Sequence, residues 1–97
     1  MKKKEKFDHP GGKFRRQGPN TCTEKELLAI IFHTGNKNLS AEQIAEKLLD
    51  KFGTVYSIAG KRLCDLMEVE GIGPVRATQI AAVFELTKRI IRHIERS

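Results

Sequence analysis

A chain of 97 residues is long enough for one small domain, and its 39% of hydrophobic residues, with one tyrosine and no tryptophan, predict a modest aliphatic core. Eighteen Lys and Arg against twelve Asp and Glu give a net charge of +6, which favours an acidic polymer as partner. No apolar run approaches the roughly 20 residues that cross a bilayer, and the basic start precedes no apolar segment, so we expect a cytoplasmic protein without membrane contact.

Residues 1–20 are predicted to form a basic flexible arm. They are rich in Lys and Arg, interrupted by Pro and Gly, and carry Phe7 and Phe14 as almost their only apolar side chains. A segment of this composition buries too little apolar surface to fold. Two interpretations stay open: the arm contacts nucleic-acid phosphates with the phenylalanines available for stacking, or it is a solvated linker.

A domain of helices is predicted over residues 21–97. Thr23 and Glu26 form a capping box ahead of an apolar run, so a largely buried helix is expected over residues 24–33. Cys22 lies at the edge of this domain and Cys64 within it, and neither has a Cys or His at zinc-ligand spacing. We expect free thiols, no metal site and no cofactor.

A second capping box begins the next helix. Ser40 and Gln43 form it, an amphipathic run follows, and Gly53 ends the helix. A short helical turn is expected over residues 54–59. With two more helices on either side of residues 71–73, the chain is predicted to be all-α with about five helices.

The most specific signal is the sequence Val-Glu-Gly-Ile-Gly-Pro-Val-Arg-Ala over residues 69–77. Gly71 and Gly73 permit backbone angles closed to other residues, so a tight turn can expose successive N–H groups. Pro74 suits the first position of a helix, and Ile72 can fill the core beneath the turn. We expect this turn to join two amphipathic helices.

A phosphate at this turn would meet backbone N–H groups, the positive end of a helix dipole and the side chain of Arg76. None of these can read a base, so binding would be independent of sequence. The alternative is a plain connection, in which a glycine ends one helix and a proline begins the next. Glu68 and Glu70 stand beside the turn and would repel phosphate unless they face away.

An internal repeat relates two parts of the chain by a shift of 36 positions without a gap. The identities pair Lys25 with Lys61, Leu27 with Leu63, Gly35 with Gly71, Ala41 with Ala77, Gln43 with Gln79, Ile44 with Ile80 and Ala45 with Ala81. We therefore predict that residues 27–48 form a degenerate first hairpin, packed on the second about a pseudo-twofold axis. Leu27 and Leu63 should then occupy equivalent core positions, as should Ile44 and Ile80.

The first turn differs from the second in one decisive place, because Lys37 stands where the second turn has Gly73. A side chain there spoils a cradle of N–H groups, so Lys37 would contact phosphate through its ammonium group instead. The first hairpin is expected to be mainly structural.

Residues 63–80 resemble the helix-hairpin-helix family of DNA-backbone binders, through the hydrophobic-Gly-hydrophobic-Gly turn and the small Ala77. Over residues 20–92 the chain resembles the N-terminal domain of the RadC family, bacterial proteins labelled as DNA repair proteins. That resemblance rests on Glu26-Leu27-Leu28-Ala29-Ile30, His33-Thr34-Gly35, the capped helix ending at Phe52-Gly53, the second hairpin and Glu85-Leu86.

The RadC resemblance implies a tandem helix-hairpin-helix domain that the family joins to a C-terminal JAB/MPN domain with a zinc-dependent, metalloprotease-like site. We expect that second domain to be absent here, since the chain has no His-x-His motif. Similar hairpins hold a monovalent cation through carbonyl groups, which makes one a candidate ligand of the turn. The family often has Arg-Thr-Gly where this chain has His33, which is either a phosphate contact or a histidine at a helix end.

The leading hypothesis is a non-enzymatic module that binds the DNA backbone without sequence preference. The expected DNA-binding residues are Gly71, Ile72, Gly73, Val75 and Arg76, with auxiliary charge from the arm and from Lys37, Lys61 and Arg62. A second hypothesis is a protein-interaction or substrate-positioning domain, which Glu68 and Glu70 favour. A third is a small lyase with Lys88 or Lys61 as a Schiff-base nucleophile, for which no activating partner is evident.

Overall fold

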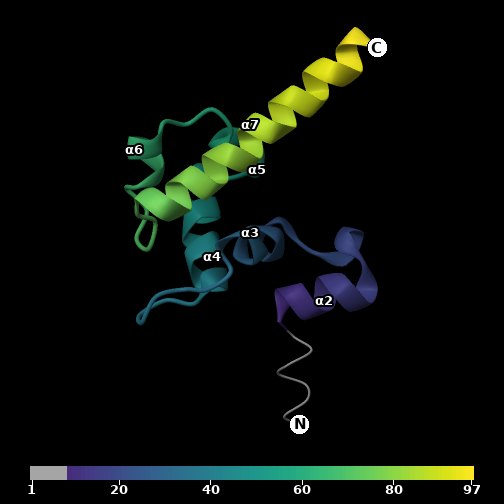
Figure 1. Cartoon of the computed structure of the whole chain (residues 1–97). Helices are drawn as coiled ribbons and strands as arrows, with labels where there is room; N and C mark the ends of the chain where they lie inside the picture. Colours follow the sequence, from purple (N-terminus) through teal and green to yellow (C-terminus); the bar gives the residue numbers. More distant parts are fainter. Residues whose placement is uncertain (1–8) are drawn as a thin grey trace.

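The computed structural model describes residues 9–97, and the first eight residues of the predicted arm lie outside that range. The described part holds the helices α2 (Pro10–Gln17), α3 (Glu24–Phe32), α4 (Ala41–Phe52), α5 (Val55–Ile58), α6 (Leu63–Leu66) and α7 (Pro74–Arg96), with the 3-10 turn η1 (Pro19–Thr21). The predicted all-α class is confirmed. Figure 1 shows α3 and α4 against the first half of α7, whose second half extends away from the body.

The capping boxes begin α3 and α4 as predicted. Thr23 Oγ1 accepts from the Glu26 N–H and the Glu26 carboxylate accepts from the Thr23 N–H, while Ser40 and Gln43 make the same reciprocal pair. The hydrogen bond from the Thr23 N–H and a second one from Lys13 lower the pKa of Glu26. In both helices the N–H groups of the N-cap residue and of the third helical residue are therefore occupied.

One part of the arm prediction is wrong, because residues 10–17 form the helix α2. Pro10 occupies its first helical position and is buried, and Lys13 Nζ lies 3.1 Å from Glu26 Oε1 of α3. The Pro-Gly-Gly start has little helix propensity of its own, so contact with α3 is what holds this short helix.

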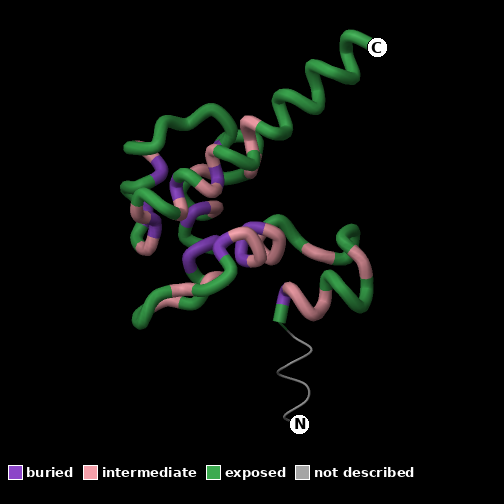
Figure 2. The backbone as a smooth tube through the Cα atoms, in the orientation of Figure 1, coloured by how far each residue is buried: buried purple, intermediate pink, exposed green. Residues whose placement is uncertain are grey.

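A single core joins all the helices from α3 to α7. Its buried members are Leu28, Phe32, Ile44, Ala45, Leu48, Ile58, Leu66, Val69, Ile72, Ala77 and Ile80. Figure 2 shows the buried backbone gathered in α3, α4 and the start of α7. The two turns of the repeat lie at the edge of this core, so their backbones are fixed by the packing below them.

The repeat is preserved after each turn but not before it. Ile44 of α4 and Ile80 of α7 are both buried, as the 36-residue shift predicts. Leu27 is only half-buried and Leu63 is 44% exposed, so the prediction that they share a core position is wrong. The reason is that α6 has four residues against nine in α3 and cannot present the same apolar face.

The outer half of α7 exposes a wide apolar face. Its aliphatic side chains are Val83, Leu86, Ile90, Ile91 and Ile94, which are 37–65% exposed. The opposite face is basic, and the carboxylate of Glu85 pairs there with Lys88, Arg89 and Arg92 at 3.6, 3.0 and 3.9 Å. None of the helices within residues 9–97 has both the length and the apolar character to cross a membrane.

Candidate nucleic-acid interface

Gly71 is required by the fold. Its φ is +92°, a region that L side chains rarely adopt, and an added Cβ would lie 2.8 Å from Ile44 Cγ1. The turn is closed by a hydrogen bond from the Ile72 N–H to the Val69 carbonyl, and the Ile72 side chain is buried. Ile72, predicted as a plug beneath the turn, is therefore confirmed in that position.

Gly73 has no such structural reason to lack a side chain. Its φ of −96° and ψ of −166° are open to any residue, and an added Cβ would meet nothing within 4 Å. The absence of a side chain leaves the backbone accessible from outside at the point where α7 begins. A bulky ligand group can approach the main chain there.

The beginning of α7 is also electrostatically open. Gly73 is the N-cap residue of α7 and has no side chain that could accept a hydrogen bond from the first N–H groups. Pro74 follows it, and the first turn contains no acidic residue. A helix of 23 residues therefore presents the N–H groups of Val75 and Arg76, and the positive end of its dipole, without a carboxylate nearby in the helix. The Val75 side chain is 73% exposed beside them.

Arg76 joins the two turns rather than extending freely into solvent. Its Nη1 donates to the Gly71 carbonyl at 3.2 Å and its Nη2 donates to the Thr34 carbonyl at 2.8 Å. Arg76 Nε is buried and has no partner. The direct phosphate contact predicted for Arg76 thus competes with a clamp that fixes both turns. Thr34, which the sequence analysis did not select, is part of that clamp.

The positive guanidinium of Arg76 also affects the candidate cation site. A monovalent cation at this turn would use carbonyl oxygens, and the Gly71 oxygen lies 3.2 Å from Arg76 Nη1. A cation bound to this oxygen would lie close to the guanidinium, and the repulsion between the two positive charges disfavours it there. Among residues 9–97, no three His, Cys, Asp or Glu side chains gather where a metal ion could bind.

The first turn satisfies its own backbone. Asn36 Oδ1 accepts hydrogen bonds from the N–H groups of Asn38 and Leu39, both at 2.8 Å, and the Asn36 N–H donates to the Leu39 carbonyl. A Cβ on Gly35 would collide with that carbonyl oxygen. Lys37 lies exposed in this turn. Thr34, three residues before Lys37, accepts the hydrogen bond from Arg76 of the second turn.

Lys61 and Arg62 are not brought to the turn. Lys61 Nζ lies 5.5 Å from the ring centre of Phe52, at the far end of α4, whereas Gly71 packs on Ile44. Eight helical residues separate those two positions, which is about 12 Å along the axis. Arg62 donates to Asp65 and lowers its pKa. The two residues form a separate basic surface.

The acidic residues beside the second turn are paired with α4. Glu70 Oε1 lies 3.5 Å from Lys47 Nζ, and Glu68 Oε1 lies 3.6 Å from Lys51 Nζ. These exposed pairs contribute little to stability, but each places a cation next to a carboxylate that would otherwise repel phosphate. The repulsion expected from the sequence is thereby reduced.

The comparisons with known proteins agree on one family. The family model described as UPF0758 N-terminal matches residues 1–78. A UPF0758 protein of Aeromonas salmonicida is 38% identical over 82 residues, which cover 84% of this chain and 37% of that protein. One from Bacillus cereus is 31% identical over 87 residues, covering 90% of this chain and 39% of the relative.

The chain thus spans little more than a third of the length of the curated relatives it matches. No solved structure shows a significant match. The matched part includes both turns, the α4 helix and the start of α7, and it confirms the RadC-family resemblance. The chain belongs to the UPF0758 family, RadC-like proteins, and corresponds to the family's N-terminal domain.

Proposed function

We propose that this domain is a tandem helix-hairpin-helix module that binds the DNA backbone without sequence preference, as the non-enzymatic part of a RadC-like repair protein in the bacterial cytoplasm. The observation that carries the proposal is the open main chain at Gly73, where no fold requirement excludes a side chain and no cap closes α7. A phosphate oxygen there would accept from the N–H groups that begin α7. Every such contact is to phosphate, which carries no base information.

The surroundings support an anionic ligand of modest affinity. Lys47 and Lys51 of α4 lie beside the carboxylates of Glu70 and Glu68, and the exposed Lys37 of the first turn adds a further positive charge to the domain. A hydrogen bond to a charged group contributes about 1.5–3 kcal/mol, so two or three contacts at one turn give weak binding. Additional phosphate contacts by the basic residues before α2 would raise the affinity and make it depend on salt.

The test is a Gly73→Val variant, with Lys37→Val as the matched control at the equivalent position of the repeat. Fluorescence anisotropy with two duplexes of unrelated sequence, at two salt concentrations, measures affinity. Gly73→Val should weaken binding about tenfold on both duplexes, because a β-branched side chain fills the approach to the main chain, and circular dichroism should remain unchanged. Lys37→Val should cost about threefold or less, with a smaller salt dependence.

Three results would contradict the proposal. One is wild-type affinity for the folded Gly73→Val variant, and another is a strong preference of the wild-type chain for one of the two duplexes. A wild-type chain that binds neither duplex at low salt would also contradict it.

A second candidate function has its own observation. The exposed aliphatic face of α7, from Val83 to Ile94, is suited to burial against another protein surface. This favours a protein-interaction or substrate-positioning domain, with the JAB/MPN domain of the full-length family as the proposed partner. Absence of duplex binding, together with loss of co-purification with a separately expressed JAB/MPN domain in Ile90→Glu, would support this candidate.

A further inference from the structure

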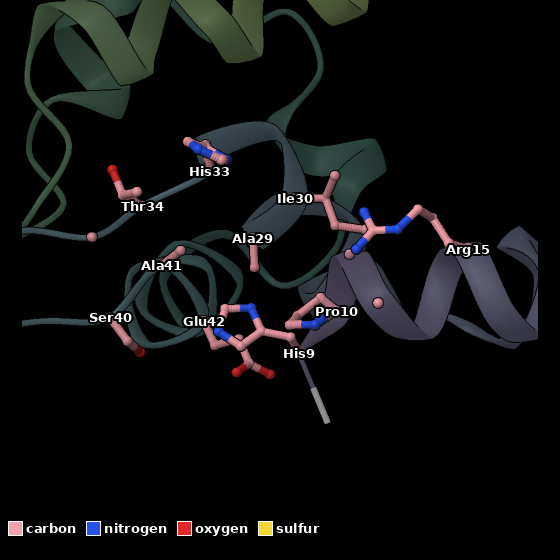
Figure 3. Close-up of a pocket in the computed structure, with 13 residues that line it drawn as sticks. His9, Pro10, Arg15, Ala29, Ile30, His33, Thr34, Ser40, Ala41 and Glu42 are labelled. Atoms are coloured by element: carbon pink, nitrogen blue, oxygen red, sulfur yellow. The ribbon is translucent and has the colours of Figure 1, made fainter. Parts of the chain in front are cut away.

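A cavity of about 620 Å³ lies beside the first turn, between α2, α3 and the start of α4. Figure 3 shows Arg15 of α2 reaching toward Ile30 of α3, with His33 at the end of α3 and Glu42 on the first turn of α4. Its volume is in the range of small-molecule sites. This space is separate from the hydrophobic core and from the main chain at Gly73 that is proposed to bind phosphate.

The walls of the cavity combine flat apolar surface with a few polar groups. Ile30 and Ala41 are half-buried and offer apolar surface to a planar ring, while Pro10 and Ala29 are almost fully buried. Arg15 folds back over the first turn of α2, where its Nη1 would lie 3.6 Å from a Cβ added to Gly11. Because Gly11 has no side chain, the guanidinium stands over the cavity with room beneath it.

The polar groups of the cavity are of two kinds. Arg15 supplies donors and a positive charge, and the imidazoles of His9 and His33 stand at the exposed rim. Glu42 supplies a carboxylate acceptor from the facing helix. A positive charge and a hydrogen-bond acceptor on either side of an apolar surface match a nucleotide, whose phosphate is anionic and whose ring carries amino groups.

The cavity and the phosphate cradle share one segment of backbone. Thr34 and Gly35 line the cavity, and the Thr34 carbonyl accepts the hydrogen bond from Arg76 at the second turn. The preceding residue, His33, is held at φ 72° and ψ −61°, with the Thr34 N–H bonded to the Phe32 carbonyl. This is a rare and strained γ-turn. The strained residue His33 lies directly before the backbone segment that connects the cavity with the second turn.

We propose that this cavity receives one unpaired nucleotide of a DNA molecule whose duplex part is bound at Gly73, an inference that rests on the proposed function. The base packs on Ile30 and Ala41, its phosphate lies toward Arg15, and Glu42 accepts from the exocyclic amino group of adenine, cytosine or guanine. Thymine has no such group and is bound less tightly. The domain then prefers DNA with gaps, flaps or frayed ends over intact duplex.

The test compares an intact duplex with the same duplex carrying one unpaired adenine or one unpaired thymine. Wild-type protein should bind the unpaired adenine about tenfold more tightly than intact duplex, and unpaired thymine about threefold less tightly than adenine. Gly11→Leu fills the cavity and has a better helix propensity than glycine, so α2 should persist. It should abolish the preference for unpaired nucleotides and leave duplex affinity unchanged.

A second pair of variants tests the base contact. Glu42→Ala should remove the difference between adenine and thymine, whereas Glu46→Ala, one turn further along α4 and outside the cavity, should preserve it. Deoxyadenosine monophosphate alone, titrated into labelled protein, distinguishes a free nucleotide from a nucleotide within a strand. Amide shifts at Gly11 and Gly35 that saturate at micromolar concentration would overturn the strand assignment in favour of a free nucleotide; their absence below millimolar supports it.

The outcomes separate this inference from the proposed function. Equal affinity of the wild-type chain for intact and unpaired DNA, or a preference that survives in Gly11→Leu, overturns the cavity assignment and leaves duplex binding at Gly73 untouched. The proposed function and the cavity assignment are both supported if Gly73→Val loses duplex binding while Gly11→Leu keeps duplex affinity and loses the preference for unpaired nucleotides.

Discussion

The two turns of the repeat show how one hydrophobic pattern supports two different surfaces. In the first turn Asn36 Oδ1 occupies the N–H groups of Asn38 and Leu39, and Ser40 with Gln43 closes the beginning of α4. In the second turn Gly73 begins α7 with no cap at all. Ile44 and Ile80, each nine residues after the first glycine of its turn, are both buried. The core therefore sets where a turn lies, and the polar residues of the turn decide whether its N–H groups remain available.

The largest loss of stability should come from Gly71→Val, and the same substitution two residues later, Gly73→Val, serves as its comparison. Gly71→Val forces a β-branched residue to φ +92° against Ile44, which should cost about 2–5 kcal/mol of folding free energy. Gly73→Val should cost about 1 kcal/mol or less, since its φ is unstrained and its surroundings are open. Urea unfolding monitored by circular dichroism measures both. Equal losses would mean that Gly73 is also structural, and the contrast between the glycines would disappear.

A smaller loss is expected when the link between the turns is cut. Arg76→Lys keeps the positive charge but cannot donate to the carbonyls of Gly71 and Thr34 together. We expect a loss of about 1–2 kcal/mol in unfolding free energy and a decrease in duplex affinity smaller than that of Gly73→Val. If stability is unchanged while affinity falls tenfold, Arg76 contacts phosphate directly and the clamp is unimportant.

The smallest effect should follow from opening the first turn. Asn36→Ala removes the acceptor shared by two N–H groups and should destabilise the fold by about 1 kcal/mol. Duplex affinity should stay within twofold of wild type, because the capping box and Glu42 still close the beginning of α4. Chemical denaturation and anisotropy check the two parts separately. An affinity loss as large as that of Gly73→Val would assign DNA contact to the first turn as well.

Local sequence determined where most helices begin and end. The Thr23 and Ser40 capping boxes and Gly53 place the bounds of α3 and α4, and Pro74 places the start of α7. These signals act within a few residues of each other, so no tertiary contact is needed to interpret them. The Gly-Ile-Gly-Pro turn was recognisable for the same reason. The family resemblance rested on these local motifs and was confirmed by the UPF0758 relatives.

Tertiary structure decided what those local motifs do. Residues 10–17 have a weak helix propensity, and tertiary contacts such as the buried Pro10 and the pair of Lys13 with Glu26 hold them as α2. Arg76 looked like a free cation, yet its partner Thr34 is 42 residues away in the chain. Lys61 and Arg62 share the basic composition of the candidate site but lie at the other end of α4.

The glycines mark the same division between sequence and structure. Sequence alone made Gly71 and Gly73 equivalent members of one turn, because the absence of a side chain is identical in both. Packing separated them, since a Cβ on Gly71 would enter the core at Ile44 and one on Gly73 would enter open space. Local patterns fix backbone conformation through short-range sterics, whereas the space around a residue depends on segments distant in the chain.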